Sequence, residues 1–207
     1  PADIDSVTII ADSLFIISIN EALAAQETNM VTALGTNMDF TGNRNGWTAT
    51  GATNHGHGNN TAEEFRNQGH DGFEVYQEIT GLPAGSYKVT AQAYYRPTGY
   101  NEAAAIFDPA DPKADVTAYL DANGAREKVH SIFELTFDSS EGMAGRFATI
   151  SGSNTALDGK MVADDLASAE AVLTADDRTN YEVSVIGYVG EDGELRLGIT
   201  GEATTLA

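Results

Sequence analysis

Cysteine is absent from the chain, and this absence excludes several kinds of chemistry. Without thiols there are no disulfides, no zinc–thiolate sites and no cysteine nucleophiles. Basic residues are scarce too: 11 Lys and Arg stand against 31 Asp and Glu, a formal net charge of −20. Nucleic acids and anionic lipid surfaces need clustered Lys and Arg, so we expect neither as a partner. An ordinary solvated acidic surface is the favoured explanation of this charge, which also suits a neutral ligand or bound Ca²⁺.

Long apolar runs are also missing. The cluster Leu14-Phe15-Ile16-Ile17 is too short to span a bilayer, so we expect no membrane insertion. The start, Pro1-Ala2-Asp3, has no basic segment ahead of an apolar run, so no signal peptide is visible. The first residue is not Met, which is compatible with a signal that has been removed.

Recognisable catalytic motifs are absent as well. The chain has no Gly-x-Ser-x-Gly elbow, no phosphate-binding loop and no His-Glu-x-x-His motif. Paired carboxylates occur throughout so acidic a sequence, so their presence does not indicate glycoside hydrolysis. We therefore expect a non-enzymatic protein, or an accessory domain of a glycoside hydrolase.

What the sequence does contain is a β pattern that begins near residue 30. With 207 residues, 42% of them hydrophobic, the chain is long enough for one β-sandwich domain with its own core. Residues 1–29 differ: 13–26 is predicted as a helix, although the β-branched stretches 7–10 and 16–19 fit strands equally well. Residues 30–207 are predicted as the β domain. Its expected strands are 47–52, 62–66, 73–80, 86–96, 115–122, 127–137, 181–189 and 194–200.

Hydrophobic residues alternate along most of these strands. One face of the first long strand carries Phe73, Val75, Gln77 and Ile79, and one face of the next carries Tyr87, Val89, Ala91, Ala93 and Tyr95. A period of two predicts antiparallel sheets with one wetted side. The turn between the two strands, residues 82–85, has Pro and Gly where a type I turn prefers them. We expect one helix across residues 162–173, and we expect the core amide of Gln77 to tie strands or a loop together.

Several motifs in order resemble a known family. They are Asn45-Gly46-Trp47-Thr48, residues 60–65 (NTAEEF), residues 73–87 (FEVYQEITGLPAGSY), Tyr94-Tyr95-Arg96, residues 118–124 (AYLDANG) and residues 192–199 (DGELRLGI). Together they are similar to the galactose-binding-domain-like jelly-roll modules of secreted and surface glycan-degrading proteins of gut and rumen Bacteroidota. The resemblance covers roughly residues 30–200. Such modules usually close with an aromatic-Asp-Asn-Phe strand, which this sequence lacks, and residues 1–29 have no counterpart in them.

The resemblance implies an all-β antiparallel sandwich of jelly-roll type with one or two short helices. It implies a non-catalytic carbohydrate-binding module, extracellular or on the cell surface, linked to other domains and often carrying a structural Ca²⁺. Its partner would be a plant or other polysaccharide. The alternative is a structural or adhesive extracellular module that binds protein or spaces domains. A third class, a histidine-dependent metallohydrolase, would require a bound transition metal.

Candidate ligand contacts lie at the end of the strand 86–96. Strand parity places Gln92, Tyr94 and Arg96 on the face opposite Tyr95, where an aromatic ring and planar polar groups suit a pyranose. The alternative is an exposed tyrosine with an arginine stacked on it. In the loop that follows, Tyr100 beside Asn101 offers a second aromatic and amide pair.

Three other residues are candidates with strong structural alternatives. Trp47 suits sugar stacking, although a core position is favoured because the similar modules pack this tryptophan inward. His55 and His57, in a His-Gly-His sequence, could chelate a metal or bond sugar hydroxyls, but a polar loop explains them as well. The loop acids Asp108, Asp111 and Asp115 do not match an EF-hand or dockerin pattern, so the ligands of any Ca²⁺ stay unassigned.

Overall fold

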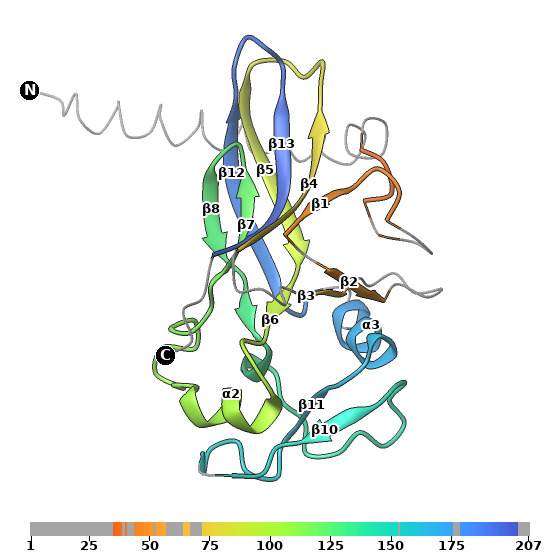
Figure 1. Cartoon of the computed structure of the whole chain (residues 1–207), viewed down its shortest axis with the longest axis vertical. Coiled ribbons are helices and arrows are strands. Elements are labelled where there is room, and N and C mark those ends of the chain that lie inside the picture. Colours follow the sequence, from red (N-terminus) through yellow and green to blue (C-terminus); the bar gives the residue numbers. More distant parts are fainter. Residues whose placement is uncertain are drawn as a thin grey trace, which may run out of the picture. The chain divides into compact units, whose positions relative to one another are not determined.

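The computed structural model describes residues 35–38, 40, 44–51, 53–56, 64–66, 72–152, 154–175 and 179–202 (Figure 1). For 53–56 and 64–66 it describes the backbone alone. The chain divides into two compact units, Pro1–Gly35 and Thr36–Ala207, and every described helix and strand belongs to the second. The helix predicted at 13–26 and the alternative strands at 7–10 and 16–19 lie outside the described residues.

The largest sheet has five strands, all antiparallel to their neighbours. In spatial order they are β1 (Thr48–Thr50), β4 (Phe73–Ile79), β13 (Leu195–Gly201), β7 (Ala118–Ala122) and β8 (Ala125–Lys128). The alternation predicted for β4 is confirmed: Val75, Gln77 and Ile79 are all buried. Between β7 and β8 the chain turns at Asn123 and Gly124, whose φ angles of 49° and 82° suit a two-residue hairpin turn.

The Asn123 side chain ties this turn to two other strands. Its amide nitrogen donates to the carbonyls of Tyr188 at 2.9 Å and Glu194 at 2.8 Å, and its amide oxygen accepts from the Arg196 backbone N–H at 2.8 Å. These three hydrogen bonds tie the β7–β8 hairpin to β13 and to the separate strand that contains Tyr188.

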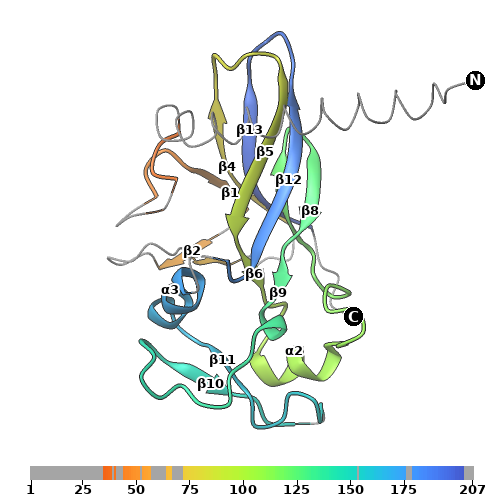
Figure 2. The same cartoon turned by 180° about the vertical axis from the view of Figure 1, so that it is seen from behind.

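A two-stranded ribbon packs against the five-stranded sheet (Figure 2). It consists of β5 (Gly85–Gln92) and β12 (Glu182–Val189), paired antiparallel along their whole length. On β12 the residues Val183, Val185 and Val189 are buried, and β12 contacts β7 and β8. The two layers approach closely at Gly187, where a Cβ would lie 2.7 Å from the Cβ of Ala122. Only glycine fits at that crossing.

The remaining elements are short and include the two described α-helices. They are β2 (Thr53–Gly56), β3 (Glu64–Arg66), β6 (Tyr94–Tyr95), α2 (Tyr100–Ile106), β9 (His130–Ser131), the 3₁₀ helix η1 (Ile132–Glu134), β10 (Phe147–Thr149), β11 (Met161–Ala163) and α3 (Leu166–Thr174). We call α2, η1, β10, β11 and α3, with the chain joining β9 to α3, the end region, because Figures 1 and 2 both place them beyond one end of the long strands.

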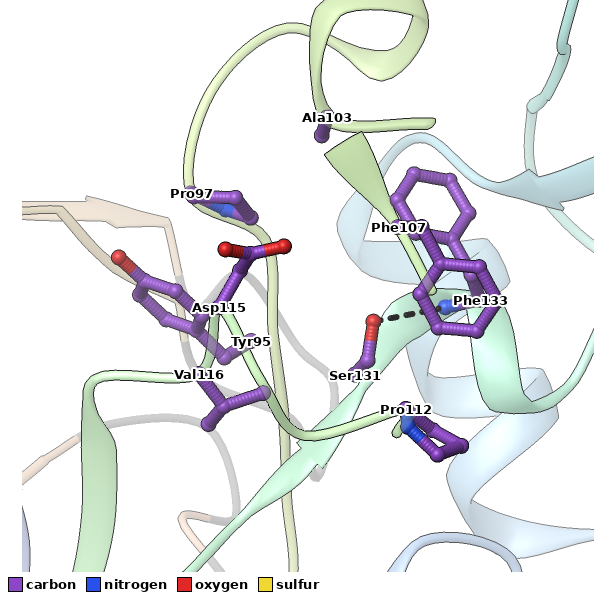
Figure 3. A pocket seen from close by; sticks show the side chains of 9 residues that line it. All are labelled: Tyr95, Pro97, Ala103, Phe107, Pro112, Asp115, Val116, Ser131 and Phe133. Atoms are coloured by element: carbon purple, nitrogen blue, oxygen red, sulfur yellow. Dashed lines mark hydrogen bonds between the residues drawn. The ribbon is translucent and has the colours of Figure 1, made fainter. Parts of the chain in front are cut away.

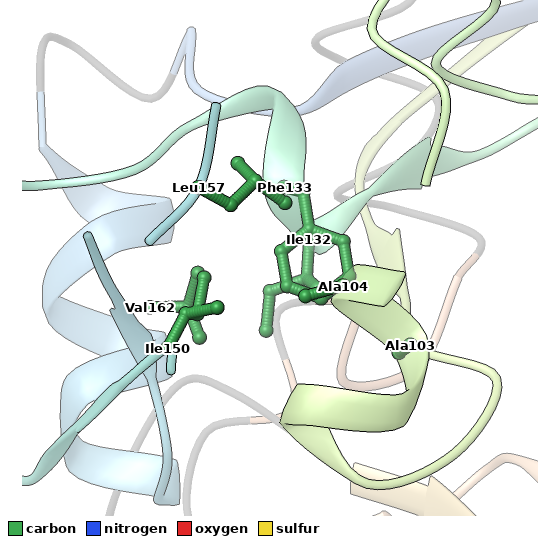
Figure 4. Packing of buried hydrophobic residues seen from close by; sticks show 7 residues of the cluster. All are labelled: Ala103, Ala104, Ile132, Phe133, Ile150, Leu157 and Val162. Carbon is green, nitrogen blue, oxygen red and sulfur yellow. The ribbon is translucent and has the colours of Figure 1, made fainter. Parts of the chain in front are cut away.

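The end region has its own apolar interior. One buried cluster contains Ala103, Ala104, Ile132, Phe133, Ile150, Leu157 and Val162 (Figure 4), and a second contains Ala163, Val172 and Tyr181. Tyr181 anchors this interior to the start of β12, because its hydroxyl donates to the Ile132 carbonyl at 2.7 Å and lies 3.1 Å from that of Leu135. Burial raises the pKa of the Tyr181 phenol.

Most of the predicted strands are confirmed, and the differences have local causes. The strand predicted at 127–137 is wrong in its second half: Ser131 and Glu134 form a capping box that starts η1. The helix predicted at 162–173 begins only at Leu166, because Asp165 caps it by accepting from the Ser168 backbone N–H. The sequence prediction missed α2, β2, β10 and β11. The structural role expected for Gln77 is confirmed, since its amide bonds both backbone groups of Thr36.

Mostly antiparallel strands with two helices among the described residues confirm the all-β class. The finer assignment, a sandwich or jelly roll, stays a prediction.

Candidate functional site

The predicted exposure of Tyr94 is wrong. Its ring is half-buried, packs against both apolar clusters of the end region and lies 4.9 Å from the ring of Tyr181. The predicted strand 86–96 breaks at Ala93, whose backbone N–H donates to the Tyr181 carbonyl at 3.0 Å. Strand parity counted from β5 therefore does not extend to Tyr94. Tyr95 is also half-buried, and its hydroxyl accepts from the Thr117 hydroxyl at 3.0 Å.

The structure does bring Arg96, Tyr100 and Asn101 into one place. The Arg96 guanidinium lies 3.9 Å from the centre of the Tyr100 ring. That ring also packs against the first apolar cluster, and its hydroxyl points to the Asp164 carbonyl at 3.4 Å. The Asn101 side chain accepts from the Ser151 backbone N–H at 3.0 Å. All three residues thus help to hold α2 against the rest of the end region, and the Tyr100 ring has limited surface left for a ligand.

The other candidates lie apart from this group. Gln92 ends β5, pairs with Glu182 and is half-buried. Trp47 is half-buried as well; its indole N–H donates to the Asn37 carbonyl at 2.9 Å, and its ring stacks on Phe40 at 4.7 Å. The side chain of His55 and all of His57 lie outside the described residues. The predicted ligand set therefore does not form a single surface among the residues that the structure describes.

A small hollow lies beside α2 (Figure 3). Its lining residues are Tyr95, Pro97, Ala103, Phe107, Pro112, Asp115, Val116, Ser131 and Phe133. The volume is about 240 Å³ with the open space at its mouth included, below the roughly 300–1,000 Å³ of small-molecule sites. The Ser131 hydroxyl in its wall already accepts from the Phe133 backbone N–H. This hollow is too small to enclose a sugar.

No group of three His, Asp or Glu side chains that could hold a metal occurs among the described residues. In the acidic loop, Asp108 is used within the loop itself, because its carboxylate accepts from the Ala110 backbone N–H at 2.8 Å.

A larger group of aromatic and charged side chains lies on the outer face of the five-stranded sheet, the side turned away from the ribbon. Cross-strand pairing places its members side by side: Tyr76 pairs with Gly198, Gly198 with Asp121 and Asp121 with Arg126 in one row, and Glu74 pairs with Thr200 and Thr200 with Tyr119 in the next. We call these residues, with Arg196 and Glu202 beside them, the sheet face.

One aromatic group of the sheet face is centred on Tyr76. The Arg196 guanidinium lies 3.7 Å from the centre of the Tyr76 ring. It also donates to the Glu74 carboxylate at 2.7 Å, and this hydrogen bond is the main reason why the pKa of Arg196 is raised. The arginine is thus held in place from two directions and is only about one-third exposed.

The second group is centred on Tyr119. Arg126 lies 5.9 Å from the centre of the Tyr119 ring and donates to the Asp121 carboxylate at 2.9 Å. The Glu202 carboxylate is 4.0 Å from the same guanidinium. Burial, followed by the charge of Glu202, raises the pKa of the Tyr119 phenol, so the hydroxyl stays a neutral donor and acceptor at ordinary pH.

The strand β13 runs between the two groups, and at Gly198 no side chain projects from it. A Cβ at Gly198 would overlap the Val75 carbonyl oxygen, so no side chain fits there. Thr200 is 6% exposed, and among the described residues its buried hydroxyl has no hydrogen-bond partner. A buried hydroxyl without a partner is costly, and such a group calls for an explanation.

The sequence prediction missed the sheet face, although a signal for it was present. The alternation that placed Val75 and Gln77 in the core also places Glu74 and Tyr76 on the opposite side, and the same holds for Arg196, Gly198 and Thr200. What the sequence does not contain is the pairing of β4 with β13 and of β13 with β7, which joins residues far apart in the chain.

No helix among the described residues is long and apolar enough to cross a membrane. No protein-family model, curated protein or solved structure matches the chain.

Proposed function

We propose that this protein is a non-catalytic carbohydrate-binding module and that its ligand lies on the sheet face. The observation that carries the proposal is the pair of tyrosine–arginine–carboxylate groups on one side of a sheet. The sequence resemblance to glycan-binding modules predicts the same class of ligand, although it placed the site on other residues. An accompanying structural Ca²⁺, a linked enzyme and a location outside the cell are parts of the same proposal.

The chemistry of these groups suits a sugar. An aromatic ring packs against the C–H face of a pyranose, while arginine and carboxylate pairs donate to and accept from its hydroxyls. Because Arg196 and Arg126 are already held by Glu74 and Asp121, little side-chain freedom is lost when a ligand binds. The face of a sheet can also accommodate a long polysaccharide, whereas the hollow beside α2 cannot.

The second candidate, a structural or adhesive module, rests on a different surface. On the outer side of the ribbon Ile186 is 61% exposed and Tyr188 is 66% exposed, two residues apart on one strand. Adjacent exposed apolar side chains of this kind suit contact with another protein. The two functions can be separated because the two surfaces share no residue.

The test is calorimetry and affinity electrophoresis against a panel of polysaccharides, each with and without Ca²⁺. We expect binding to at least one glycan, and we expect Tyr76→Ala to weaken it by at least about tenfold. Tyr188→Ala is the matched control, a tyrosine removed from the other surface, and should leave binding unchanged. Binding to no glycan would favour the adhesive module, and loss of binding in Tyr188→Ala alone would move the site to the ribbon.

A further inference from the structure

We propose that the sheet face selects an uncharged glycan chain that crosses β4, β13 and β7, with one sugar ring at Tyr76, another at Tyr119 and Thr200 between them. This inference rests on the proposed function and names the ligand class of the same site.

The charge of the ligand follows from the pairing of the arginines. Arg196 is held by Glu74 at 2.7 Å, and Arg126 by Asp121 at 2.9 Å with Glu202 nearby. A uronate or sulfate would have to displace a carboxylate from its arginine, and it would approach a chain of net charge −20. Sugar hydroxyls need no such exchange, because they can donate to the partly exposed Glu74 and Glu202 carboxylates and accept from the remaining N–H groups of the same arginines. The site therefore favours uncharged sugars.

The length of the ligand follows from the strand order. Tyr76 lies on β4 and Tyr119 on β7, with β13 between them. Two strand spacings amount to about 10 Å. The register adds an offset along the strands, because Tyr76 pairs with Gly198 whereas Tyr119 pairs with Thr200. One pyranose cannot touch both tyrosine rings across this gap. An oligosaccharide can, and the missing side chain at Gly198 leaves the path between them low.

The unsatisfied hydroxyl of Thr200 lies in the middle of this path. Its cross-strand neighbours are Glu74 of one aromatic group and Tyr119 of the other. The hydroxyl is fully covered in the unbound protein, so the proposed contact with a sugar hydroxyl requires a neighbouring side chain to move. Such a contact would satisfy a group that has no partner among the described residues, which makes Thr200 a specificity-determining residue for the glycan.

The experiment uses the full chain and the neutral polysaccharide that the panel identifies. Calorimetry is run with its oligosaccharides from one to six sugars, and with the same polymer after oxidation of its primary hydroxyls to carboxylates. We expect affinity to rise with length by at least about tenfold, the oxidised polymer to bind at least about tenfold more weakly, and binding of the neutral polymer to be insensitive to salt. Equal affinity for a monosaccharide and a hexasaccharide, or for neutral and oxidised polymer, would overturn the inference.

Substitutions at Thr200 test the middle of the path. Thr200→Val keeps the shape of the side chain and removes the hydroxyl, so the melting temperature should stay the same or rise while affinity falls several-fold; Thr200→Ser should retain affinity. Thr90→Val is the control, because the Thr90 hydroxyl lies on the ribbon, 2.9 Å from that of Ser184. Unchanged affinity in Thr200→Val would remove Thr200 from the site. Binding to no glycan at all would instead reject the proposed function itself, so the two failures are distinct.

Discussion

Two close arginine–tyrosine contacts of almost the same distance lie among the residues that the structure describes, and their surroundings differ. Arg96 lies 3.9 Å from the ring centre of Tyr100, and Arg196 lies 3.7 Å from that of Tyr76. The Tyr100 ring packs against an apolar cluster and its hydroxyl points to a backbone carbonyl. Tyr76 lies on the side of β4 opposite the buried Val75, next to a glycine on β13. The same pair of residues thus serves packing in one place and lies on the proposed glycan-binding face in the other.

The largest expected effect on stability comes from removing Tyr181, whose buried ring belongs to the interior of the end region. The Tyr100 stack lies in the same region. Tyr181→Ala deletes a ring that is 7% exposed and packs on Tyr94, together with the hydroxyl that bonds the Ile132 carbonyl. We expect a loss of about 3–5 kcal/mol in the free energy of unfolding, measured by chemical denaturation. Tyr188→Ala, at a 66% exposed position, should change it by less than about 0.5 kcal/mol. Equal losses in the two variants would contradict the assignment of Tyr181 to the core.

The difference between the two stacks is tested most directly by removing the tyrosine from each of them. Tyr100→Ala should lower the free energy of unfolding by about 2–3 kcal/mol, because a half-buried ring leaves an apolar cluster, and should leave glycan affinity unchanged. Tyr76 is half-buried as well but lies on the side of β4 opposite the buried Val75, so Tyr76→Ala should cost less, about 1 kcal/mol, and should weaken glycan binding. Denaturation and calorimetry on the same two proteins check both halves. The reverse pattern would place the binding surface beside α2.

The sequence predicted the long strands better than the site, for a physical reason. Burial of every second residue imposes a pattern that can be seen in β4, β5, β12 and β13, and the structure confirms these strands. The same pattern failed beyond Ala93, where the chain leaves β12 and pairs with β9 instead, and where the Tyr94 ring packs against Tyr181 in the end region. No local pattern encodes that contact, because the two residues are far apart in the chain. The sheet face depends in the same way on which strands become neighbours.

A smaller effect tests whether local capping, rather than hydrophobic pattern, sets the start of α3. Asp165→Ala should lower the free energy of unfolding by about 1 kcal/mol at pH 7, since the carboxylate accepts from the backbone N–H groups of Ser168 and Arg146. The Ser168 hydrogen bond is the main reason why the pKa of Asp165 is lowered. A carboxyl whose pKa is lower in the folded state stabilises above its ordinary pKa, so this contribution should disappear as the pH falls below about 4.

Asp165→Asn provides the matched control for that experiment. The amide can cap the helix without titrating, so this variant should retain most of the stability at pH 7 and lose the pH-dependent part. Denaturation at pH 7 and at pH 3 separates the two contributions. Equal stability of the wild type and Asp165→Ala at pH 7 would show that the apolar face of α3 suffices to position the helix.

Substituting the two arginines should have the smallest effect on stability. It should also distinguish the two stacks most clearly, by the effect on glycan affinity. Arg96→Ala and Arg196→Ala each remove a guanidinium from a tyrosine ring, which is worth about 0.5–1 kcal/mol at partly exposed sites. We expect similar small losses of stability but different binding: Arg196→Ala also releases Glu74 from its 2.7 Å pair and should weaken glycan affinity, whereas Arg96→Ala should not. Arg196→Lys should fail to restore the affinity, because an ammonium cannot stack on the ring and engage a carboxylate with a planar set of donors. If lysine restores binding in full, charge alone is needed at this position, and the stacked geometry is not what distinguishes the sheet face from the surface beside α2.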